Sequence, residues 1–159
     1  GEQHVLDVLH DGQALWHGMF LEDHTYHYSV ECLTPVRLCR FHRADFEALL
    51  ANHPDVALGL IRMITTDLDD AEERIMMLSI RDPRQRLAEY LLIRDRRCSG
   101  PEIRLKLDDI GASVGLRPET VSRNIARFVR EGLLQRTGRG RLLVIDHEGL
   151  REISSPGGK

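Results

Sequence analysis

The chain has 159 residues, of which 42% are hydrophobic and 30% are charged. This composition is typical of a globular protein with one large or two small domains, and it excludes a disordered or fibrous chain. No apolar run approaches the roughly 18 residues of a transmembrane helix, and the first ten residues lack the pattern of a signal peptide, so we expect a soluble, cytoplasmic protein. The three cysteines form no C-x-x-C pair, which excludes a disulfide framework and a self-contained zinc finger.

The formal net charge of −3 hides an uneven distribution along the chain. Residues 101–159 hold 11 Lys or Arg against 8 Asp or Glu, whereas residues 1–100 hold 11 against 17. Six basic residues lie between Arg123 and Arg141. A basic patch on an acidic protein indicates a site for a polyanion, although an ordinary solvated helix face is the alternative.

The first 41 residues predict short antiparallel strands. The segments YHYSVECL (26–33) and VRLCRF (36–41) alternate or run apolar between turn signals such as the DG and TP dipeptides. A short helix is predicted next, over Arg43–Asn52. It ends before Pro54, because the residue that precedes a proline avoids the α region.

The longest periodic segment predicts a helix over residues 55–79. Its apolar residues recur at alternating spacings of four and three, which is a heptad seam of about three repeats. We expect this seam to pair with a second copy in a homodimer, because Val56, Leu60 and Met63 offer another apolar face for packing within the chain. The alternative is that the seam packs on the protein's own sheet. The seam residues are Ala57, Ile61, Ile64, Leu68, Ala71, Ile75 and Leu78.

A further amphipathic helix is predicted after the Asp82-Pro83 pair, over the sequence RQRLAEYLLIRDRR. The segment CSGPE, residues 98–102, is a plausible linker. We therefore place a domain boundary between roughly 80 and 102.

Residues 103–153 have the pattern of a winged helix-turn-helix. A strand-like IRLKL leads to Asp108, a good N-cap for a short helix. Gly115 permits a turn with positive φ, and Leu116 fills the gap between the two helices. The second helix is predicted over Pro118–Glu131, because proline is tolerated in a first helical turn.

The second helix divides into an apolar and a polar face. Val121, Ile125, Phe128 and Val129 repeat at core spacing, and the opposite face carries Glu119, Ser122 and Arg123. Arginine can bind guanine through two parallel hydrogen bonds, glutamate can accept from cytosine, and serine can serve a base or a phosphate. All three leave the N-terminal half of the helix, which enters the major groove in helix-turn-helix docking. We therefore predict that these three residues contact bases.

The segment LLQRTGRGRLLVI predicts two strands around a turn, which form the wing. Basic and polar side chains of the helix and the wing suit contacts with the DNA backbone. The predicted backbone contacts are Arg117, Thr120, Arg127, Arg136, Arg139 and Arg141. The alternative is a winged helix that contacts only proteins.

The sequence DDIGASVGLRPETVSRNIARFVREGLL, followed by an arginine-rich wing, resembles the DNA-binding domain of the Crp/Fnr superfamily of transcription regulators. Its E-x-x-S-R pattern is similar to the Fnr branch. The resemblance implies an α+β fold with a partial antiparallel, cyclic-nucleotide-binding-like β-roll, a long dimerisation helix and a C-terminal winged helix-turn-helix. It also implies a palindrome of TTGAT-like half-sites in double-stranded DNA and contact with RNA polymerase. The implied parts are the roll (1–54), the dimerisation helix (55–80), a connecting helix and linker (81–102) and the DNA-binding domain (103–159).

The same resemblance bears on the signal that is sensed. Cyclic-nucleotide binders of the superfamily have a G-E pair and a later arginine for the cyclic phosphate, whereas here Met19 follows Gly18 and the segment DHTYHYS has no arginine. We therefore expect no response to cyclic nucleotides. The opening strands of the roll are missing, so we expect the chain to be a truncated form.

Cys39 matches the position at which oxygen-sensing Fnr proteins place one of four thiolate ligands for an iron-sulfur cluster. Cys32 and Cys98 lack the spacing to replace the other ligands, so we expect no cofactor in this chain itself and an iron-sulfur cluster, with oxygen, redox or nitrosative sensing, only in a longer protein. The alternative is that Cys39 is a small buried hydrophobe on a strand.

Four histidines, at positions 17, 24, 27 and 42, suggest a competing class of function, a metal-dependent enzyme. The chain lacks a carboxylate-histidine motif on a helix, a nucleophile with a paired base and a phosphate-binding glycine loop. We therefore expect no enzyme and no metal site. A dimeric protein-interaction module with a degenerate winged helix is the third hypothesis.

Overall fold

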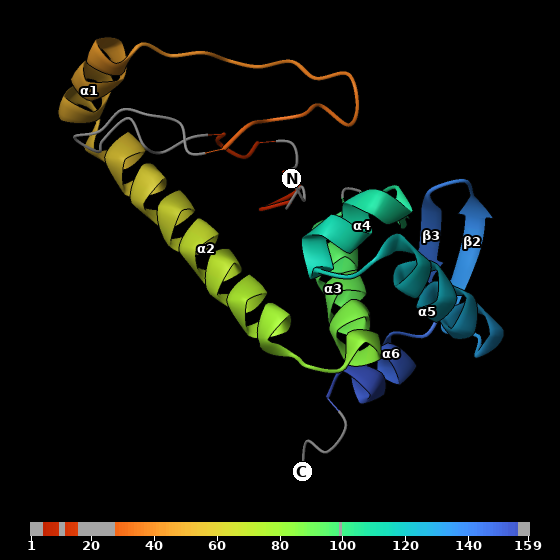
Figure 1. Cartoon of the computed structure of the whole chain (residues 1–159). Helices are drawn as coiled ribbons and strands as arrows, with labels where there is room; N and C mark the ends of the chain where they lie inside the picture. The colour runs from red at the N-terminus through yellow and green to blue at the C-terminus, as the bar shows by residue number, and fades with distance from the viewer. Residues whose placement is uncertain (1–4, 10–11, 16–27, 99, 156–159) are drawn as a thin grey trace. The chain divides into compact units, whose positions relative to one another are not determined.

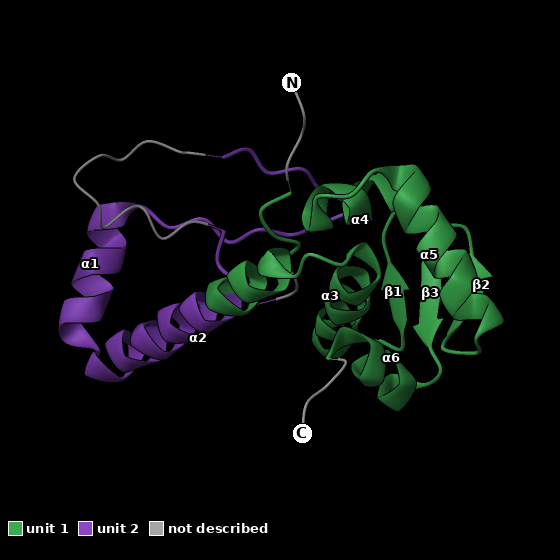
Figure 2. Ribbon diagram, turned by 60° about the horizontal axis from the view of Figure 1, so that its bottom comes forward, with its two compact units in different colours: residues 1–11, 71–159 green, residues 12–70 purple. Residues whose placement is uncertain are grey.

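The computed structural model describes residues 5–9, 12–15, 28–98 and 100–155 (Figure 1). It forms two compact units, one of residues 12–70 and one of residues 1–11 with 71–159 (Figure 2). Helix α2 (Pro54–Ser79) contributes residues to both units.

Helix α1 (Arg43–Asn52) belongs to the unit of residues 12–70 and has the predicted bounds. It ends at His53, whose backbone N–H donates to the carbonyl of Leu49 at 2.9 Å. The strands predicted at 26–33 and 36–41 are wrong for the part of these segments that the structure describes, since residues 28–42 contain no strand and are exposed throughout. A strand needs a neighbouring strand for its backbone hydrogen bonds, and alternation of side chains does not supply one.

Helix α2 confirms the predicted helix 55–79 to within one residue at its start. The second apolar face, Val56, Leu60 and Met63, is half-buried. The heptad seam lies open in the single chain: Leu68 is 59% exposed and Ile75 is 67% exposed. Ile75, which belongs to the same unit as the sheet, is therefore not packed on the sheet in the described structure.

The C-terminal unit contains the sheet and the other helices. Helix α3 (Pro83–Arg97) is followed by β1 (Glu102–Arg104), α4 (Leu107–Val114), α5 (Pro118–Arg130), β2 (Leu134–Gly138), β3 (Arg141–Val144) and α6 (His147–Ser154). The three strands are antiparallel in the order β1-β3-β2. The α+β class and the winged helix-turn-helix architecture are confirmed, whereas the domain limits near residues 54, 80 and 102 stay a prediction.

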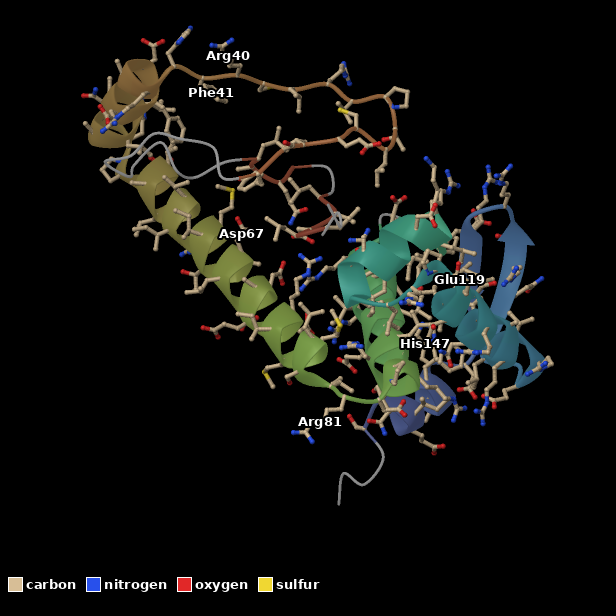
Figure 3. All side chains as sticks on the ribbon, in the orientation of Figure 1. Arg40, Phe41, Asp67, Arg81, Glu119 and His147 are labelled. Atoms are coloured by element: carbon tan, nitrogen blue, oxygen red, sulfur yellow. The ribbon has the colours of Figure 1, made fainter. Side chains whose placement is uncertain are left out.

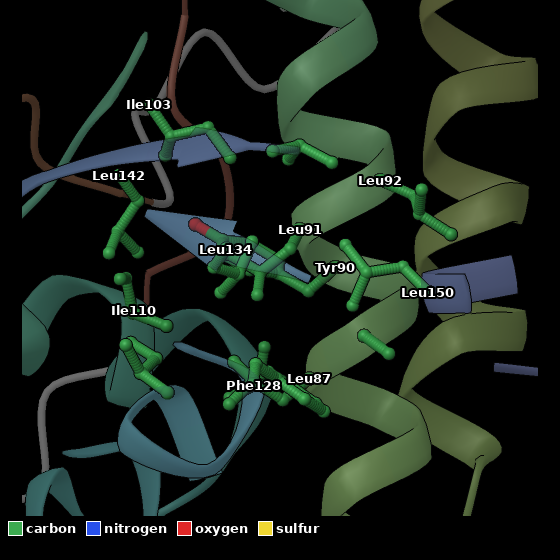
Figure 4. Close-up of a cluster of buried hydrophobic side chains, with 14 of the residues drawn as sticks. Leu87, Tyr90, Leu91, Leu92, Ile103, Ile110, Phe128, Leu134, Leu142 and Leu150 are labelled. Carbon is green, nitrogen blue, oxygen red and sulfur yellow. The ribbon is translucent and has the colours of Figure 1, made fainter. Parts of the chain in front are cut away.

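The core of this unit lies between the helices and the sheet (Figure 4). Helix α3 presents Leu87 and Leu91 to it, and both side chains are fully buried. Burial of one such side chain stabilises the fold by about 1.5–3 kcal/mol. The other large, fully buried side chains are Tyr90, Ile103, Ile110, Ile125, Phe128, Leu134 and Leu150.

Helix α6 was not predicted from the sequence. Asp146 caps it by accepting from the backbone N–H of Gly149 at 2.9 Å, and Leu150 is fully buried. The helix packs on α3, where the ring Nε2 of His147 lies 2.8 Å from a carboxylate oxygen of Asp95. The C-terminal segment therefore completes the hydrophobic core of this unit.

Candidate DNA interface

The turn between α4 and α5 is built on two glycines. Gly115 ends α4 in the left-handed region, with φ of 63° and ψ of 40°, as the sequence predicted. The backbone N–H of Leu116 then donates to the carbonyl of Gly111 at 3.0 Å. A Cβ on Gly111 would lie 2.6 Å from the carbonyl oxygen of Leu116, so only glycine allows this approach. Gly111 is a structural residue that the sequence analysis missed.

The start of α4 differs from the prediction. The N-cap is Lys106, which makes no side-chain capping hydrogen bond, and Asp108 lies within the first turn. The helix begins at Leu107, earlier than a cap at Asp108 requires. A carboxylate in the first turn still favours the helix through its interaction with the helix dipole.

Helix α5 presents the two faces that the periodicity predicts. Its inward residues Val121, Ile125 and Phe128 are fully buried. The helix begins at Pro118 and ends at Arg130, so the predicted last residue, Glu131, is its C-cap. The buried face fixes the rotation of the helix, and with it the direction of the opposite face.

The three predicted base-contacting residues lie on that opposite face of α5. Glu119 and Arg123 are exposed and Ser122 is half-buried, and Glu119 is labelled on α5 in Figure 3. In the part of the chain that the structure describes, Arg123 forms no ion pair, so its guanidinium is available to a ligand.

The predicted backbone contacts fall into two groups. Arg117, Arg136 and Arg139 form no ion pair with any described residue. Arg117, Arg136 and Arg139 are exposed, whereas Thr120 is half-buried. Strand β2 packs against α5, so the helix and the wing present their arginines from one packed unit (Figure 1). The wing has a register shift between Arg136 and Gly138 and turns at residues 139–140.

Arg127 and Arg141 lie beside carboxylates. The Nε of Arg127 donates to Glu131 at 2.8 Å. A hydrogen bond from Thr137 and the charges of Arg104 and Arg141 lower the pKa of Glu102. The hydrogen bond from Arg127 and the ion pair with Arg84 likewise lower the pKa of Glu131. Both carboxylates are therefore firmly ionised next to the basic face, and the sequence analysis gave neither a role.

The structure does not assemble a metal site in the residues that it describes, where no group of three His, Cys, Asp or Glu side chains has the geometry to hold an ion. Of the four histidines, those at 17, 24 and 27 lie outside the described residues. Cys39 is exposed and lies outside any strand, which contradicts the alternative that it is buried on a strand. Burial raises the pKa of the Cys98 thiol, which disfavours its thiolate.

The described helices include none that combines the length and apolar character needed to cross a membrane.

The protein-family model of the Crp-like helix-turn-helix domain matches residues 85–153, which contain α4, α5 and the wing. The transcriptional activator protein FnrL of Cereibacter sphaeroides is 30% identical over 93% of this chain and 67% of its own length. The chain belongs to the Crp/Fnr family. It is a transcription regulator of this type with a helix-turn-helix domain.

Other members of the Crp/Fnr family support the same assignment. The cyclic AMP receptor protein of Thermus thermophilus is 28% identical over 97% of this chain and 71% of its own length. The solved structure of FixK2 from Bradyrhizobium japonicum is similar with a TM-score of 0.65 and 27% identity, over 73% of this chain. The chain spans only 60% of that FixK2 chain, and 56% of the nitrogen fixation regulation protein FixK of Azorhizobium caulinodans.

Proposed function

We propose that two copies of this chain bind a palindromic DNA duplex, each placing α5 in a major groove, and thereby regulate transcription. The outward face of α5 is the observation that supports this proposal: Glu119 and Arg123 are exposed, and Arg123 is free of ion pairs with the described residues. These side chains match the donors and acceptors of base edges in the major groove. The DNA-binding fold thus carries groups that contact bases as well as phosphates.

The E-x-x-S-R pattern and the similarity to FnrL support TTGAT-like half-sites. FnrL is named a transcriptional activator, so we propose activation through contact with RNA polymerase on DNA in the cytoplasm. The segment DHTYHYS has no arginine for a cyclic phosphate, which supports a regulator that does not respond to cyclic nucleotides. We therefore expect the DNA affinity to be unchanged when cyclic AMP is added.

Base recognition is tested with Arg123→Ala and a fluorescent TTGAT palindrome. We expect the free energy of binding to this duplex to weaken by about 1–3 kcal/mol, because one bidentate contact with a base is removed. We also expect a weaker preference for the native base at one position of the half-site. Arg130→Ala removes the same charge from the last turn of α5 and is the matched control. Normal discrimination by Arg123→Ala would contradict the base-reading role. A dimer without any salt-sensitive DNA binding would favour the interaction module instead.

The exposed seam of α2 supports the homodimer. Leu68→Asp places a charge on the seam, so sedimentation equilibrium is expected to show monomers. Met76→Asp is the control, because Met76 is 71% exposed and lies outside the heptad seam of the same helix. A dimer that survives Leu68→Asp would contradict the assignment of the seam.

An iron-sulfur cluster does not fit the cysteines of this chain. Such a cluster takes four protein ligands, whereas the chain has three cysteines. We propose Cys39 as a ligand only where three further thiolates are supplied by other residues of the native gene product. Iron and sulfide analysis of that product, with and without Cys39→Ser, tests this proposal.

A further inference from the structure

We propose that Glu131 is a positioning residue for DNA binding, which ties the C-terminal end of α5 to the first turn of α3 and orients Arg127 for a phosphate. The inference rests on the proposed function, in which α5 enters the major groove. It assigns a role to a carboxylate whose two oxygens accept hydrogen bonds from arginines.

Both oxygens of Glu131 bind arginines, and the two arginines come from different helices. One oxygen accepts from the Nε of Arg127 on α5 at 2.8 Å, and the other accepts from an Nη of Arg84 on α3 at 2.6 Å. The side chains of Glu131 and Arg84 are 34% and 29% exposed. The carboxylate is therefore a bridge between two elements that are far apart in the sequence.

The position of Glu131 is otherwise poor for an acid. It is the C-cap of α5, where the helix dipole disfavours a negative charge. An arginine four residues before a glutamate is also the weaker order for a helical ion pair. The pKa of Glu131 is nevertheless lowered, first by the hydrogen bond from Arg127 and then by Arg84. The two arginines thus favour the ionised carboxylate more than burial disfavours it.

Arg84 also packs on α5 directly. Its guanidinium carbon lies 5.7 Å from the ring centroid of Phe128, which is fully buried. Its Nε is buried and has no hydrogen-bond partner among the described residues, so the guanidinium is held by the ring and by Glu131. Arg84 follows Asp82, the N-cap of α3, shortly after α2 ends at Ser79. The bridge therefore connects the C-terminal end of α5 to the first turn of α3, which follows α2 in the chain.

The bridge also determines which donors of Arg127 remain for DNA. Glu131 occupies the Nε, so the two amino groups of the guanidinium are the donors left for a phosphate. Arg127 lies one helical turn after Arg123 on the same face, where a backbone contact would accompany base contact.

The direction in which DNA affinity changes in Glu131→Gln distinguishes a positioning role from a purely electrostatic effect of the charge. Glu131→Gln removes a negative charge beside the DNA, so electrostatics alone predicts tighter binding. Positioning predicts weaker binding to the TTGAT palindrome, by roughly two- to fivefold. It also predicts a salt dependence whose slope is smaller by about 0.9 for each phosphate contact that is lost.

The control is Glu148→Gln, which breaks an arginine pair within α6 at 2.9 Å and is expected to leave DNA affinity unchanged. Arg84→Gln is expected to weaken binding as Glu131→Gln does, and the double variant is expected to lose no more than either single variant. Arg84→Lys keeps the charge but loses the planar donor pair, so it tests the bridge if Glu131→Gln is poorly folded by circular dichroism.

Folded Glu131→Gln that binds as tightly as the unmodified protein, or more tightly, would overturn the inference. Fully additive losses in the double variant, or full affinity in Arg84→Lys when Glu131→Gln is unfolded, would do the same. If the unmodified protein binds no duplex in a salt-sensitive manner, the proposed function fails instead, and the two failures are thereby distinguished.

Discussion

Gly111 is the position in the helix-turn-helix at which the structure predicts the clearest steric conflict for an added side chain. The Cβ of an alanine at this position would lie 2.6 Å from the carbonyl oxygen of Leu116 and 3.7 Å from the backbone nitrogen of Pro118. Both atoms belong to the backbone, so no side-chain rotation relieves the contact. The turn, and with it the start of α5, must move.

Two opposing effects determine the magnitude for Gly111→Ala. In a helix interior, alanine stabilises the helix by about 1 kcal/mol relative to glycine. Overpacking in a closely packed site costs about 1–3 kcal/mol, and the upper part of this range applies because the contact is with backbone. The net expectation is a free energy of unfolding that falls by about 1–2 kcal/mol, together with weaker DNA binding because α5 is displaced.

Urea denaturation followed by circular dichroism measures this change, with Gly59→Ala as the matched control. Gly59 also lies within a helix, α2, but a Cβ there meets nothing within 4 Å. Gly59→Ala is therefore expected to raise the free energy of unfolding by about 0.4–1 kcal/mol. If Gly111→Ala is as stable as the unmodified chain, or the two substitutions shift stability equally, the reasoning from the close backbone approach is refuted.

Three further predictions concern caps and charge. Asp82→Ala removes a side chain that accepts from two backbone N–H groups at 2.8 Å, so we expect the free energy of unfolding in urea to fall by about 0.5–2 kcal/mol. The control is Lys106→Ala, at an N-cap with no side-chain capping bond, which is expected to change this free energy little. Gly115→Ala, at a φ of 63°, is expected to lower the melting temperature through a cost of about 1–2 kcal/mol, and Gly115→Asn is expected to cost less. The pKa of Glu131 is lowered in the folded state, so its contribution to stability is present above the unfolded pKa and is lost as pH falls through the folded pKa. The free energies of unfolding of the unmodified chain and of Glu131→Gln are therefore expected to differ at about pH 7 and to approach each other as the pH falls below the usual range of a glutamate carboxyl. A difference that stays constant as the pH falls would contradict the linkage.

The sequence predicted α5 well because several local signals agree there. Pro118 marks its first turn, and Val121, Ile125 and Phe128 recur at core spacing, so the outward face follows from the inward one. The turn before it was equally clear, since Gly115 adopts the positive φ that favours glycine. Helix type and orientation were therefore predictable where one stripe of side chains is buried by a local partner.

The strands expected before residue 42 show the limit of the same reasoning. Alternating residues predict which side chains share a face, but a strand forms only when its backbone groups find a neighbour. Among the described residues, 28–42 find none, whereas β3 finds β1 and β2 as partners in the C-terminal unit. Pairing is a long-range property, and a period of two contains no information about it.

The Arg84–Glu131 pair is hidden from the sequence for a related reason. The two residues are 47 positions apart, and each has a plausible local role: Arg84 in the first turn of a helix and Glu131 four residues after Arg127. Only the local half of the bridge, the spacing of Arg127 and Glu131, is a sequence signal, and it resembles any surface ion pair. What distinguishes Glu131 is that its second oxygen reaches α3 while its position opposes the helix dipole, and both facts require the fold. Residues that orient a binding surface are thus harder to predict than residues that form it, because their partners lie on other elements.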